Sequence, residues 1–448
     1  VAMSAVIEHL RSRREAHLRQ LTEYLRMPSI STLNVGVREA AGHLAGLMRE
    51  AGAEAQILPT EGHPVVYGEA RGPAGAPVLL VYGHYDVQPA EAGEGWSSPP
   101  FEPQVREGRL YARGAGDNKG QHFAQLKALE AFKATGTPLP VTVKFLIEGE
   151  EEMGSTHLRE FVLQHRALLG ADIACSSDGS LHPSRRPTLA LGCRGLLYLE
   201  LIARGVGKDL HSGSYGGAVE SPFWRLMQAV QALRGPDGRV RVPGFYDAVR
   251  PLGRADQEAL AGIPDPASEL RAALGEGAER AGDMGAFYTK TLTGPNLNIC
   301  GFQGGYSGEG MKTVIPGAVR AKVDFRLVVD QDPHRLFEDV RAFLGKEGFG
   351  DIEVRKLATF EPSKTPAGHP LIQKIIAAIA RGGQEPVVYP NFGGSVPDTV
   401  FTKDLGVPSV WLPLANADSN SHAPDENLRL DVFHMGCELA ARVMEGLG

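Results

Sequence analysis

The spacing of apolar residues predicts helices at the start of the chain and then strands that alternate with helices. Helical spacing marks a pair of helices at Val6, Ile7, Leu10, Leu18, Leu21 and Leu25, and a further helix over residues 41–48. Apolar runs predict buried strands within 76–84, 141–150 and 171–178, with helical patterns between them at 121–132 and 155–165. Ser155 or Thr156 is the expected cap of the latter helix. This alternation predicts an α/β domain with a mainly parallel sheet and helices on both faces.

The pattern changes from residue 195 onward. Residues 195–205 and 318–329 alternate as strands do, and helical spacing appears at 221–233 and 335–348. We therefore expect a smaller α+β domain over residues 195–361, inserted into a first domain made of residues 1–194 and 362–448. Two domains also agree with the length of 448 residues, which exceeds what one core usually holds.

Composition and charge exclude several classes of protein. The net charge of −7 argues against a nucleic-acid partner, which would need a basic surface. No apolar run is long enough to span a bilayer, so no membrane partner is expected, and the start lacks the apolar stretch of a secretion signal. The four cysteines lie far apart and form no C-x-x-C pair, which favours neither a disulfide framework nor a thiolate zinc site. We expect a cytoplasmic protein.

The glycine-rich stretch "RGAGDNKGQ" at residues 113–121 is not a phosphate-binding loop. Its glycines read G-x-G-x-x-x-G, and Lys119 precedes Gly120 instead of following it. Asp117 would repel a phosphate at this turn. The turn is therefore expected to present Asp117 to something positively charged.

Polar residues gather where the predicted strands end. His84 and Asp86 follow the first strand, residues 150–152 are three glutamates after the second, and Asp178 ends the third. Asp117 opens the intervening helix on the same side. Because ligands of open parallel sheets bind beyond the carboxyl ends of the strands, these side chains are expected to meet.

So many carboxylates require a cation among them or raised pKa values. Histidine with aspartate and glutamate suits zinc, manganese or cobalt, and a bridging aspartate would allow two ions about 3.5–4 Å apart. Taken singly, His84 is better explained as a core histidine, three successive glutamates are usually a solvated loop, and Asp178 before Gly179 fits a turn residue. Their joint position at three strand ends favours the metal site.

At these residues the chain resembles the dinuclear zinc or manganese metallopeptidases, a family that includes carnosine and bacterial dipeptidases, aminoacylase, glutamate carboxypeptidase and succinyl-diaminopimelate desuccinylase. The resemblance covers almost the whole chain. The strings that carry it are "YGHYDVQP", "GRLYARGAGDNKGQ", "EGEEEMGS", "SSDG", "DLHSGSYGG", "KTVIPGAV", "FRLVVDQDP", "FGGSVPDT" and "NSHAPDEN". Nine strings in the family's order are far more specific than any one of them.

The resemblance implies a role for each residue of the cluster. It implies two divalent ions, zinc before manganese or cobalt. One would be bound by His84, Asp117 and Asp178, and the other by Asp117, Glu152 and His422. It further implies that Asp86 orients the His84 imidazole and that Glu151 is the general base. The sequence alone does not choose among the three glutamates.

The resemblance also assigns residues of the inserted domain, which it implies is a lid and dimerisation domain. His211 would stabilise the developing oxyanion from the partner subunit of a homodimer. Thr313 and Arg326 would hold the substrate carboxylate, with backbone donors around Gly394 and Ser395.

Three functional hypotheses follow. The first is a metal-dependent dipeptidase or short-peptide carboxypeptidase, which the strings "YGHYDVQP" and "DNKGQ" favour. The second is a deacylase of N-acyl amino acids with the same metal site. The third is a catalytically silent binding or scaffold protein. This hypothesis is disfavoured because every expected metal ligand and the expected base are present.

Overall fold

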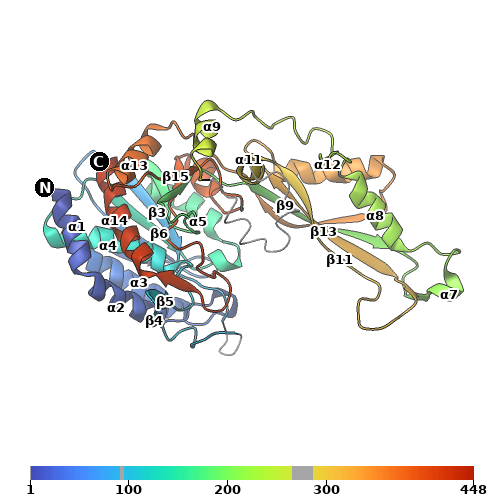
Figure 1. Cartoon of the computed structure of the whole chain (residues 1–448), viewed down its shortest axis with the longest axis horizontal. Coiled ribbons are helices and arrows are strands. Elements are labelled where there is room, and N and C mark those ends of the chain that lie inside the picture. Colours follow the sequence, from blue (N-terminus) through green and yellow to red (C-terminus); the bar gives the residue numbers. More distant parts are fainter. Residues whose placement is uncertain (1, 91–94, 265–285) are drawn as a thin grey trace.

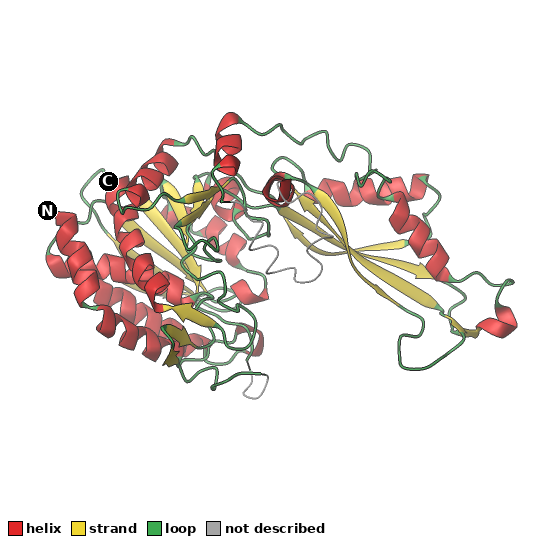
Figure 2. Cartoon of the chain, viewed as in Figure 1, coloured by secondary structure: helices red, strands yellow, loops and turns green. Residues whose placement is uncertain are grey.

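The computed structural model describes residues 2–90, 95–264 and 286–448. The chain forms two lobes joined side by side, a larger one around a broad sheet and a smaller, elongated one around a second sheet (Figure 1). Both termini lie in the larger lobe, among helices that cover the broad sheet (Figure 2).

The broad sheet has eight strands in the order β1-β2-β6-β3-β7-β16-β8-β15. Their bounds are β1 (Glu54–Leu58), β2 (Val65–Ala70), β3 (Val78–His84), β6 (Thr142–Glu148), β7 (Ile173–Ser176), β8 (Thr188–Ala190), β15 (Val387–Tyr389) and β16 (Ser409–Trp411). The central strands β6, β3, β7 and β16 run parallel, as do β8 and β15, whereas β1 and β2 add antiparallel pairings at one edge.

Strict alternation of apolar side chains explains why helices cover both faces of this sheet. In β3, Leu79 and Val81 join the core on one face, and Leu80 and Tyr82 join the core on the other. The first face carries α1 (Ala2–Ser12), α2 (Arg14–Leu25), α3 (Val37–Ala51), α4 (Lys119–Thr135), α13 (Pro370–Ala380) and α14 (Leu430–Leu447). The second carries α5 (Leu158–Gln164), α6 (Arg166–Leu169) and the π-helical segment η5 (Val400–Leu405).

The smaller lobe is built on an antiparallel sheet of four strands in the order β11-β13-β9-β14. These are β9 (Gly195–Arg204), β11 (Asn296–Gln303), β13 (Ala318–Leu327) and β14 (Glu353–Phe360), with α8 (Pro222–Ala232) and α12 (Pro333–Lys346) packed against them. Along β13, Val323 and Phe325 are buried while Arg320 and Lys322 face solvent. One face of the sheet therefore forms the core of the lobe.

The shorter elements complete the chain. They are η1 (Ser31–Leu33), β4 (Gln104–Arg106), β5 (Arg109–Tyr111), η2 (Glu151–Met153), β10 (Leu210–His211), α7 (Ser212–Tyr215), α9 (Arg254–Ala261), α11 (Phe287–Thr293), β12 (Val314–Ile315) and β17 (Asn427–Arg429). Among the described residues, no helix is both long enough and apolar enough to cross a bilayer.

The predicted fold class is confirmed: a mainly parallel sheet with helices on both faces, plus a smaller α+β unit. The antiparallel sheet uses only strands between Gly195 and Phe360, and the boundaries at 194/195 and 361/362 stay a prediction. The predicted cap of α5 is wrong. The helix begins at Leu158, and the Ser155 hydroxyl donates to the Glu148 carboxylate instead.

Candidate metal centre

The parallel pairing of β6, β3 and β7 brings three strand ends to one edge of the broad sheet. β3 ends at His84 itself, β6 ends two residues before the three glutamates, and β7 ends two residues before Asp178. Helix α4 begins just after Asp117, above the same edge. The predicted metal-binding side chains therefore start from neighbouring backbone positions.

Asp117 lies at the centre of the cluster. Its Oδ1 atom is 3.1 Å from Nε2 of His84, and its Oδ2 atom is 3.1 Å from Nε2 of His422. His84 Nε2 is also 3.6 Å from Oδ2 of Asp178, and His422 Nε2 is 3.1 Å from Oε2 of Glu152. One carboxylate thus faces two histidines that approach from opposite sides.

These residues form overlapping groups of metal-ligand type. His84, Asp117 and Asp178 make one group, and Asp117, Glu152 and His422 make another, with the ligand atoms of each within 4.8 Å of one another. Glu151 borders the cluster, with its Oε2 atom 3.8 Å from His84 Nε2. All five predicted metal ligands and the predicted base lie together.

The cations nearest in sequence do not neutralise this cluster. Lys119 is fully buried, and its ammonium donates to the Met27 carbonyl at 2.6 Å. Arg113 pairs with Glu426 at 2.9 Å. In the described part of the chain, the carboxylates therefore face two imidazoles without a lysine or arginine partner. This donor set fits divalent ions of the zinc or manganese class.

Electrostatic coupling within the cluster agrees with such a site. Hydrogen bonds to Asp117 and Glu152 raise the pKa of His422 to about 10. Burial alone would raise the pKa of Asp117, but the hydrogen bonds from His422 and His84 lower it below its usual range. Burial, together with the neighbouring carboxylates, raises the pKa of Glu151 well above its usual value. Metal ions compete with protons for such ligands.

Asp86 lies behind the cluster and is completely buried. Its Oδ1 atom is 3.3 Å from Nδ1 of His84, on the side of the ring opposite Asp117. Its two oxygens also accept hydrogen bonds from the backbone N–H groups of Glu151 and Glu152, at 3.2 and 3.1 Å. Nδ1 of His84 also donates a hydrogen bond to the backbone carbonyl of Asp86 at 3.0 Å. Asp86 thus orients the imidazole through its backbone and its carboxylate, and the carboxylate positions two of the glutamates.

Glu426 organises the "RGAGDNKGQ" turn, a role that the sequence reasoning missed. This buried carboxylate accepts hydrogen bonds from the backbone N–H groups of Gly114, Gly116 and Asp117 at 2.9–3.0 Å, besides its ion pair with Arg113. Burial raises the pKa of Glu426 to about 7. The turn therefore binds a carboxylate of its own chain. Its only signal in the sequence is the position of Glu426 within "NSHAPDEN".

Asn118 also has a structural role that the sequence did not reveal. Its carboxamide oxygen accepts from the backbone N–H of His84 at 3.1 Å, and its NH₂ group donates to the Ser177 carbonyl at 2.5 Å. Asn118 therefore ties the start of α4 to the ends of β3 and β7. Gln88 donates to Oε2 of Glu152 at 2.8 Å and restrains that side chain.

Two of the predicted substrate-binding residues meet at the junction of the lobes. Arg326, near the end of β13, donates from Nη1 to the Ser395 hydroxyl at 3.2 Å, and Gly394 precedes that serine. A second guanidinium, Arg194, donates to the Gly393 carbonyl at 2.8 Å. These groups form a basic site beside a loop rich in backbone donors.

His211 and Thr313 lie elsewhere. His211 is the residue before α7, and α7 lies at the far end of the smaller lobe (Figure 1). Both are exposed, and Thr313 Oγ1 is 3.3 Å from His211 Nε2. Thr313 precedes β13, whereas Arg326 lies near the other end of that strand, about 26 Å from its first residue, Ala318, at ~3.3 Å per residue. Within one chain, therefore, Thr313 and Arg326 do not share a binding site.

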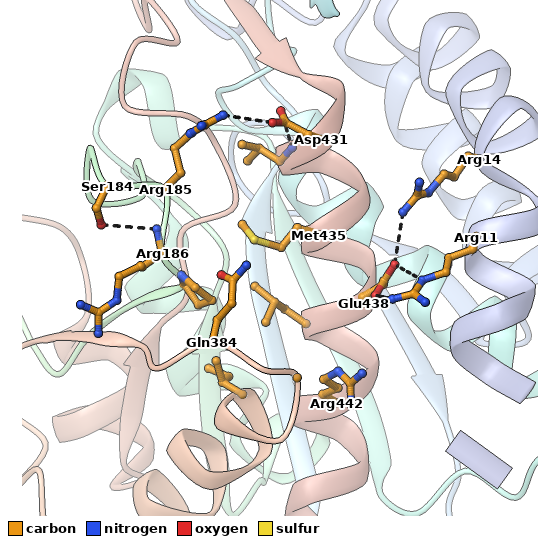
Figure 3. A pocket seen from close by; sticks show the side chains of 15 residues that line it. Arg11, Arg14, Ser184, Arg185, Arg186, Gln384, Asp431, Met435, Glu438 and Arg442 are labelled. Carbon is orange, nitrogen blue, oxygen red and sulfur yellow. Dashed lines mark hydrogen bonds and ion pairs between the residues drawn. The ribbon is translucent and has the colours of Figure 1, made fainter. Parts of the chain in front are cut away.

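A cavity of about 550 Å³ lies away from the cluster, between α1, α14 and the loop before β8 (Figure 3). Arg11 and Arg14 both pair there with Glu438, and Arg185 pairs with Asp431. None of the predicted metal-binding or substrate-binding residues lines it. The cavity therefore does not contribute to the candidate centre.

Comparison with known proteins agrees with this geometry. The family model "Peptidase family M20/M25/M40" matches residues 80–446. The chain is 28% identical to the Cys-Gly metallodipeptidase dug1 of Schizosaccharomyces pombe, over 98% of this chain and 97% of that protein. It is 32% identical to the human Beta-Ala-His dipeptidase, over 87% of this chain and 78% of that protein.

A solved structure extends the likeness to three dimensions. The M20 family metallo-carboxypeptidase of Sulfolobus solfataricus superposes with a TM-score of 0.88 at 36% identity, covering 96% of this chain and 99% of that one. The family match spans most of the sequence, and the fold and the histidine–carboxylate cluster agree with it. The chain belongs to the M20/M25/M40 family of peptidases.

Proposed function

We propose that this peptidase hydrolyses dipeptides or short peptides with two divalent ions bound around Asp117. The observation that carries the proposal is that the two oxygens of Asp117 face His84 and His422, each at 3.1 Å. His84, Asp117 and Asp178 would hold one ion, and Asp117, Glu152 and His422 the other. The names of the relatives support peptides as the substrate class.

When bound, the ions would supply Lewis-acid chemistry that polarises the scissile carbonyl and acidifies the attacking water. Glu151 is the proposed general base. It takes the proton of that water and delivers it to the leaving amine. Asp86 supports both steps because it holds His84 and the Glu151 backbone in place.

The carboxylate end of the substrate is proposed to bind where the lobes meet. Arg326 offers a guanidinium, and the loop at Gly394 and Ser395 offers N–H and hydroxyl donors. His211 and Thr313 would reach a centre only from a second subunit, because they lie at the distant end of their own lobe.

A homodimer is therefore part of the proposal. Large apolar side chains are exposed on the smaller lobe, namely Trp224 and Met227 on α8 and Ile299 and Phe302 on β11. β11 is also an edge strand of its sheet. A second copy of the chain would cover such a surface and supply His211 to the centre of its partner.

The ion class and the compartment are proposed on chemical grounds. Two imidazoles with several carboxylates suit zinc first and manganese or cobalt next. The four cysteines are free thiols, and three of them are buried, which supports a reducing cytoplasm.

A deacylase of N-acyl amino acids would use the same cluster, so the metal site does not separate the two activities. The relatives named above are dipeptidases and a carboxypeptidase, which favours peptides. The silent-scaffold hypothesis would need a missing ligand or base, and the cluster contains all of them.

The decisive experiment combines metal analysis with a substrate panel and Glu151→Gln. We expect the wild type to hydrolyse free dipeptides in preference to N-acetyl and N-succinyl amino acids, and to lose this activity in excess chelator. Glu151→Gln should retain its metal content while kcat falls by about 10²–10⁴-fold, the usual contribution of a general base.

A matched control is Glu160→Gln, which removes an exposed carboxylate on α5 and should leave kcat unchanged. Full activity in excess chelator would refute the metal-dependent mechanism. A preference for acylated amino acids would assign the chain to the deacylases.

A further inference from the structure

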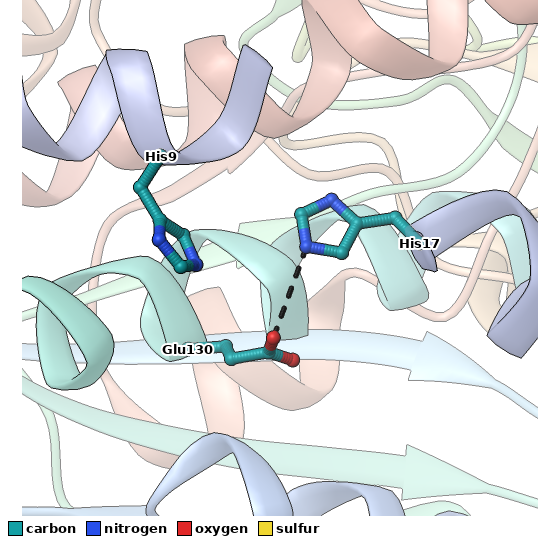
Figure 4. A group of neighbouring side chains, drawn as sticks. All are labelled: His9, His17 and Glu130. Carbon is teal, nitrogen blue, oxygen red and sulfur yellow. Dashed lines mark ion pairs between the residues drawn. The ribbon is translucent and has the colours of Figure 1, made fainter. Parts of the chain in front are cut away.

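A second group of histidines and a carboxylate lies among the helices, outside the candidate centre. His9 on α1, His17 on α2 and Glu130 on α4 each offer one ligand atom, and these atoms lie within 4.8 Å of one another. The helix axis breaks at Arg13, between α1 and α2, so the two histidines turn toward α4 from either side of the break (Figure 4). Three separate helices thus direct metal-binding atoms to one point.

One imidazole nitrogen of each histidine in this group has no hydrogen-bond partner among the described residues. Nε2 of His9 and Nε2 of His17 are both buried without one, and His17 as a whole is only 2% exposed. A buried polar atom without a partner is destabilising, so native proteins seldom leave one unpaired. Two such atoms side by side indicate a missing ligand that both would bind.

The two carboxylate oxygens of Glu130 face different groups. Lys127 donates to Oε2, whereas Oε1 faces Nε2 of His17 at 3.8 Å. That separation is too long for a hydrogen bond. Two ligands of one tetrahedral zinc ion, each about 2.0–2.1 Å from the metal, stand about 3.4 Å apart, so a small closure would complete the geometry.

The protonation states also suit a metal. Burial lowers the pKa of His9, although the neighbouring Glu130 carboxylate acts in the opposite direction. Burial alone would raise the pKa of Glu130, but His17 and Lys127 lower it to about 2, so the carboxylate is ionised. Neutral imidazole and ionised carboxylate are the forms that bind metal ions.

We propose that His9, His17 and Glu130 form a structural site for a zinc-class divalent ion, separate from the catalytic centre. Two imidazoles and one carboxylate oxygen are a zinc-type donor set, with water completing the coordination. Glu130 lies about 16 Å along α4 from Lys119, the first residue of that helix. The ion would link α1 and α2 to α4, the helix that begins beside Asp117.

The test is metal stoichiometry in the whole enzyme. We expect His9→Gln and Glu130→Gln, dialysed against buffered zinc and analysed by mass spectrometry, each to contain one zinc equivalent per chain fewer than the wild type. The difference does not depend on how many ions the catalytic centre holds. Peptide hydrolysis at saturating metal should stay within about two-fold of wild type, because neither residue lies near the candidate centre.

His434→Gln is the matched control, since this imidazole lies near His17 but outside the group, and its zinc content should equal that of the wild type. Anomalous diffraction from wild-type crystals at the zinc edge provides a readout that needs no variant, with a peak expected between His9, His17 and Glu130. Equal zinc content in all proteins, or no peak between these residues at saturating zinc, would overturn the proposal and leave His17 and Glu130 as an ion pair.

Discussion

At the scale of single residues, identical side chains differ because their partners differ. Glu150 accepts hydrogen bonds from His63 and His157 and is structural. Glu151 faces His84, and Glu152 faces His422. Three successive glutamates look equivalent in the sequence, and only the course of the chain through η2 separates their directions.

The pKa values of two histidines also depend on their neighbours, and they shift in opposite directions. The pKa of His422 rises beside two carboxylates, whereas burial and the charges of Arg14 and His17 lower the pKa of His434 to about 4. A lowered pKa means that the folded protein resists protonation of this ring. The stability this provides is complete above about pH 6.5, the usual value, and is lost as the pH falls toward 4.

We therefore predict that His434→Gln makes the protein less sensitive to acid. Between pH 7 and pH 5, the free energy of unfolding should fall less in the variant than in the wild type, because glutamine takes up no proton. Urea unfolding of both proteins in chelator at the two pH values measures this difference. Parallel losses of stability would show that His434 does not contribute to acid unfolding.

At the scale of elements, the candidate centre depends on the turn before α4. Gly114 takes a positive φ of 85° there, and its backbone N–H, with those of Gly116 and Asp117, points at Glu426. Glu426 comes just before β17, which pairs with β5. A segment from the end of the chain thus holds Asp117 in position.

Replacing Glu426 with glutamine should weaken both folding and metal binding. The change leaves Arg113 buried without its counter-charge, and breaking a buried ion pair costs about 3–5 kcal/mol. Urea unfolding and zinc titration measure the two effects. Asp425→Asn, on the neighbouring and more exposed carboxylate, is the control and should change stability by less than about 1 kcal/mol. Unchanged stability and zinc affinity in Glu426→Gln would show that the turn keeps its shape without the Glu426 carboxylate.

At the scale of the whole molecule, the chain separates groups that the proposed chemistry needs together. The cluster lies in the larger lobe, and His211 directly precedes α7, which lies at the distal end of the smaller lobe (Figure 1). The exposed apolar side chains of α8 and β11 lie on that smaller lobe. An assembly of two copies would cover them and complete each centre.

Subunit mixing tests this arrangement. His211→Ala and Glu151→Gln should each be nearly inactive as homodimers. After they are unfolded together in equal amounts and refolded, about a quarter of wild-type activity should return, because half of the dimers then carry one site with native Glu151 and native His211. Mixing either variant with itself is the control. If activity stays absent after mixing although mixed dimers form, His211 does not act across the subunits.

The sequence by itself determined the local features of the structure. Continuous apolar runs such as residues 78–84 predict strands with two buried faces, and the carboxyl ends of parallel strands indicate where His84 and Asp178 emerge. The fold class and the existence of a metal cluster follow from these patterns and from the resemblance.

Only the tertiary structure decided which distant residues meet. His422 and Glu426 reach Asp117 from about 300 positions away along the chain. His9 and His17 meet Glu130 because three helices pack on one face of the sheet. The physical reason is that spacing along the chain specifies which face a side chain occupies, whereas a contact between elements depends on how the whole core packs.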